Sequence, residues 1–73
     1  PGDAFVRAEE DLKKAGEQGL PSAWVNLGLL YQHTDRHPEA IAAFAAAAKA
    51  DPRSARYAEE RIALSRRAME TGK

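Results

Sequence analysis

The chain has 73 residues, and its 11 basic and 11 acidic side chains give a formal net charge of zero. A chain of this length forms one domain that buries only about 60% of its unfolded surface, which argues against chemistry in a deep cleft. The balanced charge removes the global electrostatic argument for nucleic acid or an anionic membrane as the main partner. Cysteine is absent, so disulfides and thiol chemistry are excluded and the localisation stays unknown.

No apolar run approaches the roughly 18 residues that a membrane span needs, so no membrane partner is expected. The chain opens with Pro1-Gly2 instead of a methionine, which suggests a processed protein or a part of a longer one. Sixteen alanines and the lack of any alternating Val, Ile or Thr segment predict an all-α fold.

The first helix is expected at residues 3–16, capped by Asp3 and ended by Gly16 and Gly19. Its apolar residues recur at spacings of three and four, as on one face of a helix: Phe5, Ala8, Leu12 and Ala15. Pro21 then opens a second helix, with Ser22 as a candidate cap. This helix is expected to run to about His33.

A polar turn is expected over residues 32–37, and Pro38 at a first helical position opens a third helix. Asp51-Pro52 ends that helix, because proline disfavours the helical conformation in the residue before it. A fourth helix is expected at residues 54–70. One side of it carries small and apolar residues: Ala55, Ala58, Ile62, Ser65 and Met69.

Eight residues of the second and third helices and the turn after them stand at the spacings of the tetratricopeptide repeat: Trp24, Leu27, Gly28, Tyr31, Ala40, Phe44, Ala47 and Pro52. Residues 21–54 therefore resemble one complete repeat of this family. The resemblance implies an antiparallel hairpin with a close contact at Gly28 and Ala40, around which the larger signature residues pack. Residues 15–31 also resemble the entry into a Sel1-like repeat, but the turn at 32–37 is shorter than the loop of that family.

The resemblance implies a single domain over residues 1–73, an antiparallel helix-turn-helix solenoid fragment of about four helices. Residues 3–16 would be the second helix of a preceding repeat. The fourth helix would be a terminal cap, because Arg61 stands where the family has leucine.

A repeat of this family implies a protein-protein interaction module and no enzyme, with a concave face that receives a partner peptide or helix. The face-lining candidates of the second helix are Ser22, Val25, Asn26, Leu29, Gln32 and His33. Those of the fourth helix are Arg56, Glu59, Glu60, Ala63, Arg66 and Arg67. A segment with an aliphatic anchor and an acidic residue would suit this face. Alternatively, Val25 and Leu29 contact the first helix or a neighbouring repeat.

A clamp for a C-terminal carboxylate is not expected, because only Asn26 and Arg56 fall at clamp-like positions. Two other functions remain open. Uncapped ends would stack into a homo-oligomer. Nucleic acid contact would use the basic residues of the C-terminal segment, where six bases meet three acids: Arg53, Arg56, Arg61, Arg66, Arg67 and Lys73. Interleaved glutamates make a solvated helix the favoured interpretation of that charge.

Catalytic and metal sites are not expected. His33, Asp35 and His37 flank a turn and lack further ligands, so they are interpreted as turn residues. Ser22, Ser54 and Ser65 have no histidine at a neighbouring helical position, and the first two are interpreted as caps. No phosphate-binding loop or other cofactor signature is present. Trp24 and Tyr31 are interpreted as core residues and not as platforms for stacking bases.

Overall fold

The computed structural model describes residues 2–71, with side chains from residue 4 onward. It contains α1 (Gly2–Glu17), α2 (Pro21–His33), α3 (His37–Ala50), the short 3-10 helix η1 (Pro52–Ser54) and α4 (Ala55–Thr71). Every regular element in this part of the chain is helical, so the all-α prediction is confirmed. The cap predicted at Asp3 and the base at Lys73 lie outside the residues whose side chains are described.

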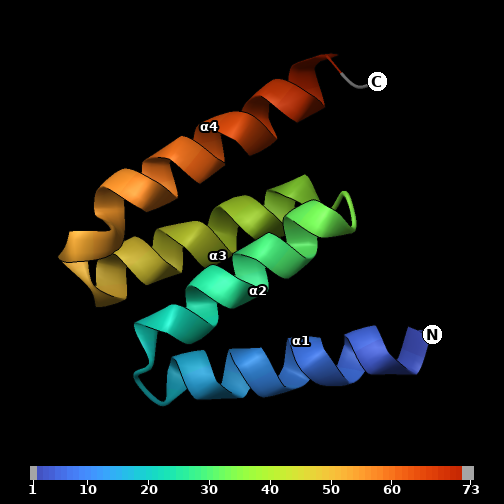
Figure 1. Cartoon of the computed structure of the whole chain (residues 1–73), viewed down its shortest axis with the longest axis vertical. Coiled ribbons are helices and arrows are strands. Elements are labelled where there is room, and N and C mark those ends of the chain that lie inside the picture. The colour runs from blue at the N-terminus through green and yellow to red at the C-terminus, as the bar shows by residue number, and fades with distance from the viewer. Residues whose placement is uncertain (1, 72–73) are drawn as a thin grey trace.

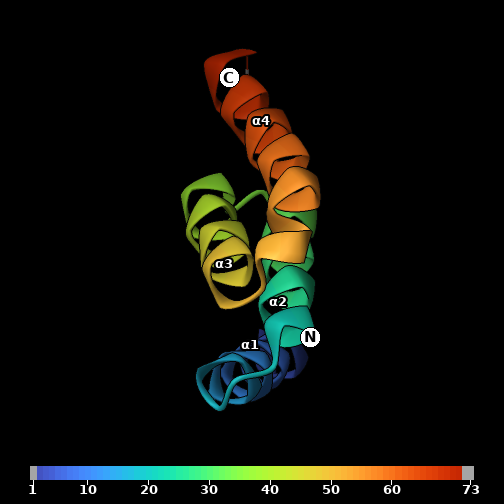
Figure 2. The same cartoon turned by 90° about the vertical axis from the view of Figure 1, so that its left-hand side faces the viewer.

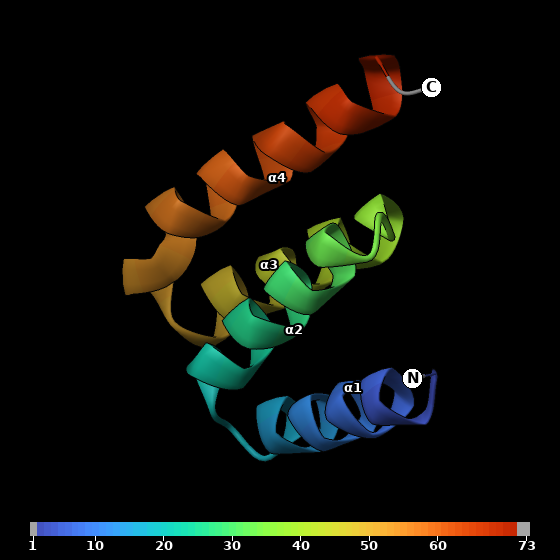
Figure 3. The same cartoon turned by 45° about the vertical axis from the view of Figure 1, so that its right-hand side comes forward.

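The four helices follow one another in chain order across a thin array that measures 35 × 33 × 12 Å. Helices α2 and α3 form the central pair, while α1 and α4 lie on opposite sides of it (Figure 1). A second view shows the same order from another side (Figure 3). Seen edge-on, α3 lies to one side of α2 and α4 (Figure 2). The array therefore has two faces, one formed by α2 and α4 and the other by α3.

Two tight turns end α1 and α2 in the same way. After α1, Leu20 N–H donates to the Ala15 carbonyl at 3.2 Å and Gly19 N–H to Gly16 at 3.0 Å. This pattern is the Schellman motif, which needs a left-handed residue, and Gly19 supplies it with a φ of 103°. After α2, Asp35 takes the equivalent place with a φ of 61°. Only Gly19 therefore ends α1, and the prediction that Gly16 also ends it is wrong.

Two further details of the helix ends differ from the predictions. The turn after α2 covers only residues 34–36, because Gln32 and His33 stay helical, and α3 begins at His37, one residue before Pro38. The residue before α2 is Leu20, which makes no side-chain capping bond, so Ser22 is not the cap.

The cap before α4 is Asp51, the residue that also ends α3 as predicted. Its carboxylate accepts a hydrogen bond from Arg53 N–H at 3.1 Å, while Ser54 belongs to η1. The prediction of Ser54 as a cap is therefore wrong. Asp51 is the capping residue because Pro52, which follows it, favours an extended backbone at Asp51, and a capping residue has this conformation.

The core lies between α2, α3 and α4. Its buried cluster consists of Leu27, Tyr31, Ala40, Ala43, Phe44 and Ala58, and Ala23 and Ala47 are buried as well. Buried alanines on α3 contribute little volume, so neighbouring helices approach closely around one fully buried aromatic side chain. That side chain is Phe44, which is completely buried.

The aromatic ring of Phe44 packs against Gly28. A Cβ added to Gly28 would lie 2.7 Å from ring atoms of Phe44, so the glycine makes room for that ring. Gly16 plays the same part on α1, where an added Cβ would lie 2.5 Å from the indole of Trp24. Phe5 and Met69 are both 46% exposed, because the predicted apolar stripes of α1 and α4 extend beyond their packed parts.

Candidate functional site

The predicted binding residues divide by exposure. Ser22, Asn26 and His33 are exposed on α2, whereas Val25 and Leu29 are half-buried and pack against the core cluster. The predicted residues of α4 are all exposed: Arg56, Glu59, Glu60, Ala63, Arg66 and Arg67. Packing thus accounts for part of the apolar surface of Val25 and Leu29, while the rest of each side chain lies at the surface.

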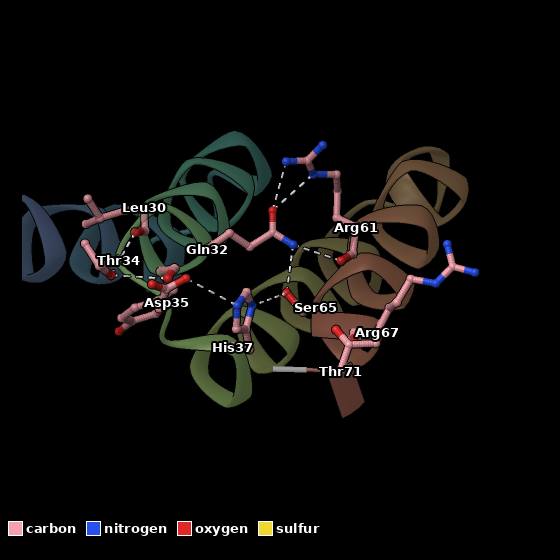
Figure 4. Close-up of polar contacts among 10 residues, drawn as sticks. Leu30, Gln32, Thr34, Asp35, His37, Arg61, Ser65, Arg67 and Thr71 are labelled. Carbon is pink, nitrogen blue, oxygen red and sulfur yellow. Dashed lines mark hydrogen bonds and ion pairs between the residues drawn. The ribbon is translucent and has the colours of Figure 1, made fainter. Parts of the chain in front are cut away.

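Gln32, also predicted as a binding residue, is occupied by contacts to α4 (Figure 4). Its amide nitrogen donates to the Arg61 carbonyl at 2.9 Å and to Ser65 Oγ at 2.8 Å. Its amide oxygen accepts from Arg61 Nε at 3.2 Å and Nη2 at 2.9 Å. These four bonds use the full hydrogen-bonding capacity of an amide. Gln32 is therefore a brace between α2 and α4, and its amide is already hydrogen-bonded within the chain.

Arg61 gains a role that the sequence did not indicate. Arg61 stands where the repeat family has leucine. Its guanidinium donates to the amide oxygen of Gln32 and lies 5.9 Å from the centre of the Tyr57 ring. Arg53 is likewise engaged, with Nε 3.1 Å from Asp51 Oδ1, and this bond lowers the pKa of the Asp51 carboxyl. Two of the arginines proposed for nucleic acid contact are thus bound within the chain.

One histidine approaches Ser65 from a different helix. His37 Nδ1 lies 3.1 Å from Ser65 Oγ, and His37 Nε2 lies 3.6 Å from Asp35 Oδ1 (Figure 4). The order of groups resembles an acid-histidine-serine relay, but Ser65 is completely buried and a substrate has no access to its hydroxyl. The contact instead joins α3 to α4, because burial of a hydroxyl requires hydrogen-bonding partners.

Helix α1 is attached to the hairpin through Glu9. The Tyr31 hydroxyl donates to Glu9 Oε2 at 2.7 Å, and Arg36 Nη1 donates to Glu9 Oε1 at 2.9 Å. The Arg36 guanidinium also lies 4.7 Å from the centre of the Tyr31 ring. The hydrogen bond from Tyr31, followed by that from Arg36, lowers the pKa of Glu9. Burial, together with the bond to Glu9, raises the pKa of Tyr31 to about 12.

The raised pKa of Tyr31 predicts a loss of stability at alkaline pH. The unfolded chain releases this proton near the ordinary value of 10.0 and the folded chain near 12, so the contribution is complete below pH 10. It declines as pH rises from 10 to 12, because only the folded state then holds the proton. Denaturation at a series of pH values should show this decline, and Tyr31→Phe should remove it. The matched control is Tyr57→Phe on α4; equal curves for both variants would contradict the prediction.

A concave surface lies between α1 and α3, with α2 as its floor. It has a volume of about 350 Å³. Its lining residues are Lys13 of α1, Trp24, Leu27 and Tyr31 of α2, and Glu39, Ala42, Ala43 and Ala46 of α3. Since each helical residue is turned by about 100° from the last, this face of α2 is nearly opposite the face that carries Asn26 and Leu29. We call this surface the Trp24 groove.

The Trp24 groove was not found from the sequence, which assigned Trp24 to the core. The structure leaves Trp24 half-buried, with its indole against Gly16 and part of the ring in the groove. A signal was available in the alanines at positions 42 and 46, whose spacing of four residues places two small side chains on one face of α3.

Across the described residues, no group of three or more His, Cys, Asp or Glu side chains is placed to hold a metal ion. No helix in that part of the chain is long and apolar enough to cross a membrane.

Helices that pack mainly on their chain neighbours, in a thin array, define a helical-repeat protein of the α-solenoid class. The family model of the tetratricopeptide repeat matches residues 21–54. This segment, which contains α2, α3 and η1, is a tetratricopeptide repeat. Comparisons with curated proteins and with solved structures gave no significant match. Tetratricopeptide repeats are generally protein-protein interaction modules and form a non-catalytic fold.

Proposed function

We propose that the chain binds a segment of a partner protein on the face formed by α2 and α4. The observation that supports the proposal is the brace at Gln32, whose four hydrogen bonds to Arg61 and Ser65 join α2 to α4. A surface held in this way needs little reordering when a ligand binds, which reduces the entropic cost of association.

The chemistry of this face suggests the type of segment. Val25 and Leu29 are half-buried and offer apolar surface near the exposed amide of Asn26. An amide both donates and accepts, so it can pair with the main chain of a ligand. Arg56 and Arg66 on α4 are exposed and favour an acidic residue, although Glu60 lies on the same helix. The proposed ligand is therefore a peptide with an aliphatic anchor and an acidic residue.

A displayed library of random peptides tests this proposal. Selected peptides should be enriched in an aliphatic residue near Asp or Glu, and their addition should change the NMR chemical shifts of Asn26, Leu29 and His33. Loss of one hydrogen bond in Asn26→Ala should weaken binding by about fivefold. Lys49→Ala, an exposed change on α3, is the control and should leave affinity unchanged. Selected peptides that shift only residues outside α2 and α4 would contradict the site.

A further inference from the structure

The Trp24 groove has the shape and lining of a site for a helix. Apolar side chains of α2 form its floor, and the exposed wall residue Ala42 and the half-buried Ala46 stand one helical turn apart on α3. Small side chains along a wall let another helix approach closely. The volume of about 350 Å³ is at the lower end of the range for ligand sites, which suits the few anchor side chains of one helix face.

Two charged residues of opposite sign lie on opposite walls and at different heights along the groove, so they distinguish its two ends. Glu9 bonds to Tyr31 and Gly16 contacts Trp24, so Lys13 on α1 is level with the middle of this stretch of α2, near Leu27. On the other wall, Phe44 contacts Gly28 and α3 runs antiparallel to α2, so Glu39 lies beyond Tyr31. Arg36 forms ion pairs there with Glu9 at 2.9 Å and with Glu39 at 3.5 Å, so two carboxylates share one guanidinium and this end keeps one net negative charge. The positive and negative positions are therefore separated along the groove by roughly six residues, or about 9 Å.

We propose that the Trp24 groove binds one amphipathic helix of a partner protein, with an acidic residue near the N-terminus of that helix and a basic residue near its C-terminus. The acidic residue pairs with Lys13 and the basic residue with Glu39. This order of charges also suits the dipole of the bound helix, which favours acids in the first turn and bases in the last. The bound helix then lies parallel to α2 and antiparallel to α1 and α3.

Two synthetic peptides test the charge order. Both have 12 residues, blocked ends, no tryptophan and leucines at spacings of three and four. One has Glu at position 3, in its first turn, and Lys at position 9, in its last turn, which matches the spacing of about six residues along the groove; the other has these two residues exchanged. Trp24 is the only tryptophan of the chain, so its fluorescence reports on the groove. The acid-first peptide should shift the emission to shorter wavelength and bind about fivefold more tightly than the exchanged peptide.

Amino-acid substitutions distinguish specific binding in the Trp24 groove from nonspecific hydrophobic binding of the peptides. Ala42→Arg places a large side chain in the groove and should weaken the acid-first peptide by about tenfold, whereas Ala45→Arg, at an exposed alanine of the same helix outside the groove lining, should not. The double variant Lys13→Glu/Glu39→Lys should prefer the exchanged peptide, which separates groove recognition from the intrinsic helicity of the peptides. Asn26→Ala should leave all these affinities unchanged. Equal binding of both peptides, no reversal in the double variant or an unchanged Trp24 emission would overturn the proposal.

Discussion

Replacing Phe44 with alanine should lower the free energy of unfolding by about 3 to 5 kcal/mol. Phe44 is completely buried, contacts α2 at Gly28, and lies edge-to-face with Tyr57 of α4 at a centroid distance of 6.3 Å. The surrounding alanines have no atoms with which to fill the cavity. A single core in a domain of this size rarely supplies more than about 3 to 5 kcal/mol, so Phe44→Ala should be largely unfolded at room temperature.

Circular dichroism during urea and thermal denaturation measures this effect. Phe44→Leu keeps part of the volume and should stay folded with a smaller loss, which retains a measurable transition. The control is Phe5→Ala on α1, where the aromatic side chain is 46% exposed and its loss should have little effect. Similar losses for the variants at residues 5 and 44 would contradict the assignment of Phe44 as the centre of the core.

Replacing Gly28 with alanine should destabilise the chain by about 1 to 3 kcal/mol, despite the better helix propensity of alanine. In an open helix this change would add about 1 kcal/mol of stability. Here the new methyl group would lie 2.7 Å from the Phe44 ring, closer than atoms can pack. The ring cannot move away easily, since it is enclosed by α2, α3 and α4.

A double-mutant cycle tests the cause of that loss. If the methyl group acts through the Phe44 ring, Gly28→Ala should cost much less in a Phe44→Leu background than in the original chain. Thermal denaturation of the four proteins gives the coupling energy. Purely additive losses would show that the cost at Gly28 arises elsewhere than in its contact with Phe44.

Local sequence signals predicted the helices well, because they depend on residues that are close in the chain. The extended residue before Pro52 ends α3 as expected, and Pro21 opens α2 as expected. The errors at helix ends have a specific source. Ser22, Ser54 and Asp51 all have capping chemistry, and the conformation of the preceding or following residue decides which of them is used.

Contacts between distant residues were the main omission. Gln32 and Arg61 are 29 residues apart, and Tyr31 and Glu9 are 22 apart. A single sequence shows that each of these side chains is polar but not which one it meets. From residue type alone, Gln32 is predicted to line the binding face, and Arg61 to stand where the repeat family has leucine. The structure shows that these two side chains are hydrogen-bonded to each other.

From residue order alone we could predict the helical class, the order of the helices and the tetratricopeptide hairpin at residues 21–54, because propensity, period and the spacing of large and small residues are local properties. The packing of Phe44 against Gly28, the bonds from Gln32 to α4 and the place of Trp24 in a groove emerge only when the helices pack together. These features depend on the distances and angles between helices, which follow from the packing of all their side chains together.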